Sequence, residues 1–163
     1  MMLELYQVGL IALALLVAFV LLAIQAWFKR TSRQATSLAI PQFTDFIDNG
    51  RAGSYVTTTF AEKALDRISA HGLGFSGKAL VMVNKDGVQV SRKGEKSFLI
   101  NKASLVGLSR SSAVIDKAVE KDGLLSLRWR LGDSEVESHF RFASSDDRES
   151  LAREVSSLIG GVN

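Results

Sequence analysis

Residues 125–142 read Leu-Ser-Leu-Arg-Trp-Arg-Leu-Gly-Asp-Ser-Glu-Val-Glu-Ser-His-Phe-Arg-Phe, and this stretch decides the fold class. Large apolar side chains alternate with polar ones on both sides of Gly132-Asp133, a two-residue turn signal, so the pattern predicts an antiparallel hairpin. In this register Arg130 lies opposite Glu135, and the next outward-facing pair again joins an arginine to a glutamate. Such pairs favour one register by about 0.2–1 kcal/mol each.

The rest of the chain from residue 53 continues in the same style. A four-residue turn at 84–87 places Val83 opposite Val88, and further short alternating segments follow up to residue 111. Near the end, a serine cap and an acidic first turn precede apolar residues at helical spacing between 151 and 159. We therefore predict an α+β, mainly β domain: about seven or eight strands, mostly antiparallel, followed by a C-terminal amphipathic helix that would plug the open end of a curled sheet.

The N-terminal segment is of a different kind. Residues 5–28 contain no charged side chain. Tyr6 and Trp27 are 21 residues apart in the sequence, about 32 Å along a helix, which matches the hydrocarbon thickness of a bilayer. Both aromatic types favour the headgroup level. The sequence predicts one membrane-spanning helix at about residues 8–28.

Basic residues follow this segment, and they predict its orientation. Lys29, Arg30 and Arg33 lie directly after the span, whereas only Glu4 and the terminal amine precede it. Because positive flanks stay in the cytoplasm, we expect a single-pass plasma-membrane protein with its N-terminus outside and its C-terminal domain in the cytoplasm. A cleaved signal peptide is disfavoured, because a basic leading region is missing and the apolar run is too long.

Residues 29–52 are predicted to link the span to the domain. The first half is polar and is expected to be loosely ordered, while Pro41 is expected to open a short amphipathic helix. Its apolar face would either enter the inner leaflet or cover the domain. That face carries Phe43, Phe46 and Ile47. The predicted organisation is an anchor at 1–28, a basic juxtamembrane linker at 29–52 and the strand-rich domain at 53–163.

Several short stretches of the domain carry a resemblance to a known family: Tyr55-Val-Thr-Thr-Thr59, Asp66-Arg-Ile68, Ala70-His-Gly-Leu-Gly74, Gly123-Leu-Leu125, Trp129 and Phe140-Arg-Phe142. With the strand-rich order and the terminal helix, they resemble small single-pass actinobacterial membrane proteins that carry a pleckstrin-homology-like (PH-like) domain. The resemblance covers the whole chain and implies the topology and the fold, an antiparallel barrel of about seven or eight strands. PH-like barrels bind phosphoinositides, peptides or proteins, so the resemblance does not choose a ligand.

Charge is unevenly distributed along the chain. The net charge of +3 is too small to favour a nucleic-acid binder. Residues 76–110 hold seven basic and two acidic side chains, a balance of +5. These basic residues lie on successive predicted strands and turns, so they are a candidate face for anionic lipid or a partner; the alternative is ordinary solubilising charge. The set comprises Lys78, Lys85, Arg92, Lys93, Lys96, Lys102 and Arg110.

Nothing in the sequence predicts catalysis, a metal site or a cofactor. The chain has no cysteine and two histidines. We expect His71 to be a turn residue, and His139 to face solvent because it alternates with Phe140. The glycines at 72, 74 and 77 have dinucleotide-motif spacing, but a β-rich stretch follows them instead of a helix. The acidic residues at 146–149 suit a helix start.

The sequence thus favours a non-enzymatic, membrane-tethered adaptor at the cytoplasmic face of the inner membrane, with a protein partner at the inner leaflet. Two alternatives remain open. The domain could read anionic lipid headgroups through the basic face, or the chain could be an accessory subunit of a transport or export assembly.

Overall fold

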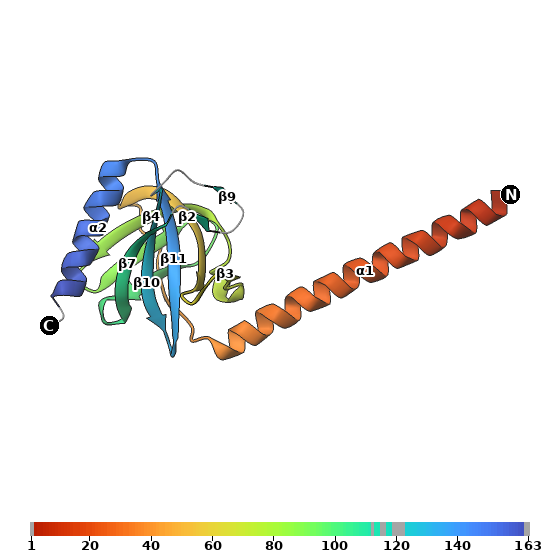
Figure 1. Ribbon diagram of the computed structural model, residues 1–163, viewed down its shortest axis with the longest axis horizontal. Coiled ribbons are helices and arrows are strands. Elements are labelled where there is room, and N and C mark those ends of the chain that lie inside the picture. Colours follow the sequence, from red (N-terminus) through yellow and green to blue (C-terminus); the bar gives the residue numbers. More distant parts are fainter. Residues whose placement is uncertain (1, 112, 115–116, 119–122, 162–163) are drawn as a thin grey trace.

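The computed structural model describes residues 2–111, 113–114, 117–118 and 123–161. Within these ranges only the backbone is described at 2–6, 30, 31, 33, 110, 111, 113, 114, 117 and 118. A long helix projects from one side of a β-barrel, and a shorter helix lies against the opposite side (Figure 1).

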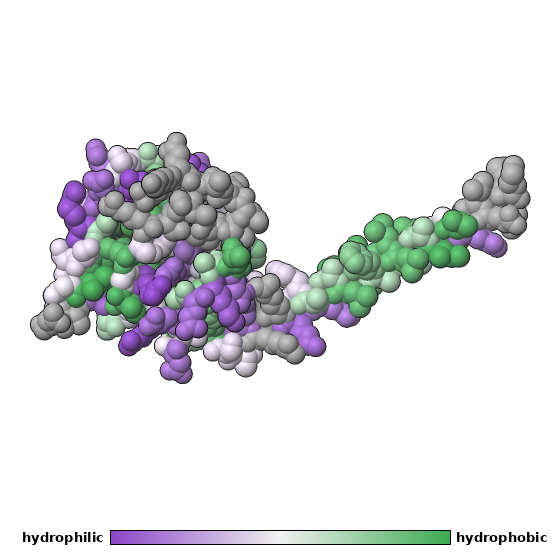
Figure 2. All heavy atoms as spheres, viewed as in Figure 1, coloured by the Kyte–Doolittle hydropathy of each residue, from purple (hydrophilic) through white to green (hydrophobic). Residues whose placement is uncertain are grey.

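The long helix, α1, spans Met2–Ser37. Among the described residues it is the one helix long and apolar enough to cross a membrane. Figure 2 shows its apolar side chains forming a continuous exposed band, in contrast to the polar barrel surface. These side chains therefore need an apolar environment outside the barrel, as a membrane-spanning segment does.

The helix continues beyond the apolar run, so the prediction of a loosely ordered segment after residue 28 is wrong. Residues 29–37 contain no glycine or proline, and nothing local ends the helix before it reaches the barrel. The end comes shortly before Pro41. Nine residues of helix, about 14 Å, separate Phe28 from the last helical residue.

Nine strands of the described chain form one antiparallel sheet, which curls into the barrel. The spatial order is β1-β6-β5-β4-β2-β11-β10-β7, with β3 paired to β2. The bounds are β1 Gln42–Thr44, β2 Arg51–Phe60, β3 Lys63–Arg67, β4 Gly77–Asn84, β5 Gly87–Arg92, β6 Ser97–Asn101, β7 Leu105–Ser111, β10 Leu124–Leu131 and β11 Ser134–Phe142. Two short strands, β8 Ala113–Val114 and β9 Lys117–Ala118, pair with each other. Single 3-10 turns lie at η1, Ala70–Gly72, and η2, Lys102–Ser104.

The two predicted hairpins are confirmed. In β10–β11, Arg130 pairs with Glu135 and Arg128 with Glu137. The Arg128 guanidinium donates to the Glu137 carboxylate over 2.8 Å. In β4–β5, the Val83–Val88 pair also lies in the predicted register.

The prediction of a short helix after Pro41 is wrong. Residues 42–44 instead form β1, the edge strand beside β6. Phe43 packs against the core from this strand, and the strand pairing satisfies backbone groups that a one-turn helix would leave open. The chain then crosses the outer face of β5, where the side chain of Gln89 donates to the Asp45 carbonyl and the Ser91 hydroxyl accepts from the Ile47 N–H.

Aromatic rings fill the barrel core. Tyr55 lies edge-on to both Phe98 and Phe140, and Phe98 stacks on Trp129. A chain of buried hydrogen bonds runs between them. Trp129 Nε1 donates to Ser138 Oγ over 3.0 Å, Ser138 lies 2.7 Å from Thr58 Oγ1, and Thr58 lies 2.6 Å from the Tyr55 hydroxyl.

The chain of hydrogen bonds ends on the backbone, since Tyr55 donates to the carbonyl of Leu73 over 2.7 Å. Burial raises the pKa of Tyr55, so its hydroxyl stays protonated and keeps this donor role. Each polar side chain of this hydrogen-bonded chain is thereby paired, which allows it to be buried without a large cost.

The terminal helix α2, Ser145–Gly160, forms as predicted. Ser144 caps it by accepting from the Asp147 N–H, and acidic residues occupy the first turn. Leu151 and Val155 enter the core, and Arg51 of β2 pairs with Glu154 on the helix. The helix is therefore fixed to the barrel by both apolar and ionic contacts.

His139 differs from the sequence prediction. It lies on the outer side of β11 as expected, yet it is only 1% exposed, and it bonds Thr59 and Ser126 on the two flanking strands. The pairing register of β11 with β2 shifts between His139 and Phe140. The hydroxyls of Thr59 and Ser126 form the hydrogen bonds of the imidazole ring that water would form with an exposed histidine. The prediction of a solvated histidine is wrong.

Candidate functional site

The first functional feature is the junction between α1 and the barrel. Gln34 clamps the backbone on both sides of Ile68: its Nε2 donates to the carbonyl of Arg67 over 3.2 Å, and its Oε1 accepts from the N–H of Ser69 over 2.7 Å. Leu38, just beyond the helix, is buried in the barrel core. The predicted anchor is thus joined to the domain by specific contacts rather than by a free linker.

The predicted membrane flanks are only partly described. Trp27 and Lys29 are exposed on α1, as interfacial residues should be. The side chains of Tyr6, Arg30 and Arg33 lie outside the described residues. Their helical positions nevertheless put the last two within the stem between Phe28 and the barrel.

The seven predicted basic residues do not form one face. Arg92 is the clearest exception, since it is 2% exposed. Its guanidinium donates to the carbonyls of Gly72 and Lys96, and it lies 4.9 Å from the ring centre of Tyr55. Burial lowers the pKa of Arg92, with Tyr55 and Glu95 acting in the opposite direction. The assignment of Arg92 to an exposed basic face is wrong. Arg92 is the last residue of β5 and lies on the same side of the strand as the core residues Val88 and Val90, so its side chain is buried at the end of the barrel.

Two of the others lie at a different end of the sheet. Lys85 occupies the β4–β5 turn, seven residues along from Lys78, or about 23 Å along an extended strand. Lys102 lies beside that turn, since its N–H donates to the carbonyl of Asp86. The side chain of Arg110 lies outside the described residues. Whether any of these residues binds lipid or protein stays a prediction.

Two of the remaining cations, Lys78 and Lys93, lie beside residues that the sequence did not single out as site residues. Strand pairing places Arg141 of β11 opposite Ser54 of β2, and Ser54 opposite Lys78 of β4. Lys93 follows β5 directly, and its N–H donates to the Lys78 carbonyl over 3.1 Å. All four are exposed on the outer face of the barrel, and together they make a row across four strands, here called the cationic row.

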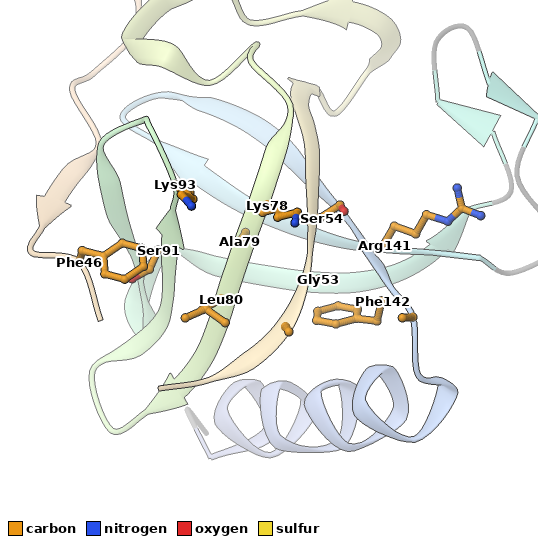
Figure 3. A pocket seen from close by; sticks show the side chains of 12 residues that line it. Phe46, Gly53, Ser54, Lys78, Ala79, Leu80, Ser91, Lys93, Arg141 and Phe142 are labelled. Carbon is orange, nitrogen blue, oxygen red and sulfur yellow. The ribbon is translucent and has the colours of Figure 1, made fainter. Parts of the chain in front are cut away.

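A hollow of about 670 Å³ lies along this row. Figure 3 shows Lys93, Lys78 and Ser54 side by side along one border, with Arg141 extending outward at the far end. Apolar side chains of Phe46, Leu80 and Phe142 line the other border. The full lining is Phe46, Ala52, Gly53, Ser54, Lys78, Ala79, Leu80, Ser91, Lys93, Arg141, Phe142 and Ala143.

The floor of the hollow depends on a close approach between two strands. A Cβ on Gly53 would meet the Arg141 carbonyl oxygen at 2.8 Å and the Phe142 ring at 3.0 Å. Glycine at this position therefore lets Phe142 lie flat beside β2, where Figure 3 shows its ring pointing toward Gly53. Any larger residue would have to displace the ring.

Residues 40–156 match a family model described as bacterial PH domain-like. The chain belongs to this family. The match covers β1, the rest of the barrel and most of α2, which confirms the predicted PH-like fold; it does not reach α1. A comparison with curated proteins finds no match.

Membership of the PH-like family constrains chemistry only loosely. PH-like domains are generally non-catalytic. Among the described residues, no group of three or more histidine or acidic side chains is arranged to hold a metal ion. The candidate functional features are therefore surfaces: the α1 junction and the hollow beside the cationic row.

Proposed function

We propose that this PH-like protein is a non-enzymatic, membrane-tethered interaction module whose barrel binds a protein partner at the cytoplasmic face of the inner membrane. The observation that carries the proposal is the clamp of Gln34 on Arg67 and Ser69. Together with the buried Leu38, it gives the barrel a defined direction relative to the span. A fixed direction is useful when a partner lies at or in the same membrane.

The orientation rests on the charges after the apolar run. Lys29, Arg30 and Arg33 favour the cytoplasmic side, and the barrel follows them directly. Tethering also raises the effective concentration of the barrel for any partner in the same membrane, so modest contacts suffice.

The test is crosslinking in native membranes with the full chain. Photoreactive residues replace one exposed side chain on separate faces of the barrel, at Lys93, Lys85, Leu65 and Glu149. We expect a discrete protein adduct from one face and none from the others. Only lipid adducts, or equal diffuse adducts from every position, would contradict the proposal.

A second candidate function is recognition of anionic lipid headgroups. It is favoured by Phe46, which is 57% exposed and lies close to Lys93 and Lys96 in a shallow surface depression. An exposed aromatic ring beside lysines is a common arrangement at membrane surfaces. The full chain in nanodiscs tests it. Hydrogen exchange in residues 91–97 should slow in anionic relative to neutral discs, and added salt should remove the difference.

A further inference from the structure

We propose that the hollow beside the cationic row binds an extended segment of the partner in which acidic and apolar residues alternate. This inference rests on the proposed function above, and it adds the surface and the chemistry of the partner. It is carried by the charge of the hollow, by the spacing of its cations and by a second, apolar border.

The charge of the hollow is uniformly positive. Lys78, Lys93 and Arg141 line it, and no carboxylate does. Within the described part of the chain, none of the three forms an ion pair. Glu95 lies two residues after Lys93 and lines the neighbouring depression, and Asp45 and Asp48 lie on either side of Phe46, but none of these three carboxylates is part of the lining of the hollow. The surface therefore lacks the internal neutralisation that other arginines of the barrel have.

The spacing of the cations matches an extended chain. Arg141 and Lys93 are three strand intervals apart, about 14 Å at the usual strand separation. In an extended segment, residues i, i+2 and i+4 lie on one side and cover about 13–14 Å. Three alternate carboxylates can thus reach the row together, whereas one phosphate group reaches one or two of its cations.

The apolar border runs parallel to the cationic row. It is formed by side chains about two residues along each strand, a displacement of roughly 7 Å. Leu80 lies between Phe46 and Phe142 along this border (Figure 3), and Ala52, which pairs with Leu80, also lines the hollow. A segment lying between the two borders directs alternate side chains to opposite sides. Acidic residues then face the cations while the intervening apolar residues face Leu80 and Phe46.

The test uses the full chain in neutral phosphatidylcholine nanodiscs, with a fluorescein-labelled peptide Gly-Glu-Leu-Glu-Leu-Glu-Leu-Gly as the probe. Fluorescence anisotropy should show saturable binding that weakens with salt. The Lys78→Glu, Lys93→Glu double variant should raise the dissociation constant about tenfold or more, because two attractive contacts become repulsive. The matched control is Lys85→Glu with Lys102→Glu, which makes the same charge change away from the hollow and should leave binding within about twofold.

Two further arms make the result specific. Phe46→Ser should weaken binding of the same probe, whereas a peptide with glutamine in place of each glutamate should not bind. A Gly-Lys-Leu-Lys-Leu-Lys-Leu-Gly peptide should bind the double variant better than it binds the unaltered chain. Circular dichroism of each variant separates lost binding from lost folding.

Several outcomes would overturn the proposal. They are equal binding of the glutamine peptide, an equal effect of the control variant, or unchanged binding by the double variant. Anionic nanodiscs that compete with the probe through Lys78 and Lys93 would assign the hollow to lipid. If the probe does not bind the unaltered chain, and the double variant still forms the protein adduct in native membranes, the hollow proposal fails and the proposed function stands.

Discussion

The hydroxyl of Ser126 lies 2.7 Å from Nδ1 of His139, on the side of the sheet that faces away from the barrel core. Thr59 holds the other ring nitrogen at 3.0 Å, so hydroxyls on the two neighbouring strands fix the imidazole. Burial lowers the pKa of His139 to about 4, although Glu137 acts to raise it. The ring is therefore neutral in the folded protein at physiological pH.

This burial predicts a loss of stability in acid. The unfolded chain takes up a proton near pH 6.5 but the folded one only near pH 4, so the free energy of unfolding should fall as pH drops through this window. The expected contribution of His139 is about 3 kcal/mol between pH 7 and pH 4. Denaturant unfolding of the full chain in detergent micelles, followed by near-ultraviolet circular dichroism, measures it. His139→Asn should flatten this part of the pH profile, and an unchanged slope would contradict the assignment.

The Gln34 clamp predicts a local effect on hydrogen exchange. Gln34→Leu removes the acceptor of the Ser69 N–H without changing the apolar run. Exchange in residues 67–73 should therefore speed up at least several-fold while the β10–β11 hairpin stays protected. Thr36→Ala is the control, because Thr36 is exposed and bonds only within α1, to the Ser32 carbonyl. Equal protection in both variants would show that the clamp does not form.

Ser138 links Trp129 to Thr58 in the buried hydrogen-bond chain. Ser138→Ala leaves Trp129 Nε1 without its acceptor and Thr58 without one of its partners, so we expect a loss of about 1–3 kcal/mol in unfolding free energy. Ser156→Ala, on the exposed side of α2, should change it by no more than about 0.5 kcal/mol. Thermal or denaturant unfolding of both variants compares them, and similar losses would be inconsistent with the buried chain.

Arg92 should matter for stability rather than for ligand binding. Arg92→Lys cannot reproduce the donors that reach Gly72 and Lys96, so the barrel end should be destabilised by about 1–3 kcal/mol. Binding of the acidic probe peptide should stay within about twofold at temperatures where the variant is folded. A selective loss of binding with unchanged unfolding would restore Arg92 to the ligand surface.

Membrane orientation can be measured directly because the chain has no cysteine. A membrane-impermeant maleimide should label Leu3→Cys in intact cells and Glu149→Cys only after permeabilisation. The physical reason is the basic flank after Phe28, which disfavours translocation of the barrel. The reverse labelling pattern would place the barrel outside.

The features that could be predicted from sequence are those set by neighbouring segments. The Arg130–Glu135 and Val83–Val88 registers follow from alternation and turn length, both of which are local. The terminal helix follows from its cap and apolar stripe. The apolar run of α1 likewise needs no partner to be recognised.

The features that were missed depend on partners distant in sequence. Nothing near Phe43 predicts that it joins β6, and nothing near Gln34 predicts a bond to Ser69. The cationic row could be inferred in part, because the predicted Val83–Val88 register, continued along the same two strands, also brings Lys78 beside Lys93. Arg141 could not be added to it, because its neighbour Ser54 is set by a β2–β11 register that shifts partway along the strands.

Because the helix is continuous between Phe28 and Gln34, the number of residues in this stem sets the rotation of the barrel about the helix axis. One residue inserted in this stem would lift the barrel by about 1.5 Å and swing it by about 100° around the span. Seven inserted residues would add almost two full helical turns, which restores the rotation of the barrel and moves it about 10 Å further from the membrane. The length of the stem thus sets both the distance of the barrel from the membrane and its rotation about the helix axis. A partner fixed in the same membrane can therefore contact the cationic row only for certain stem lengths.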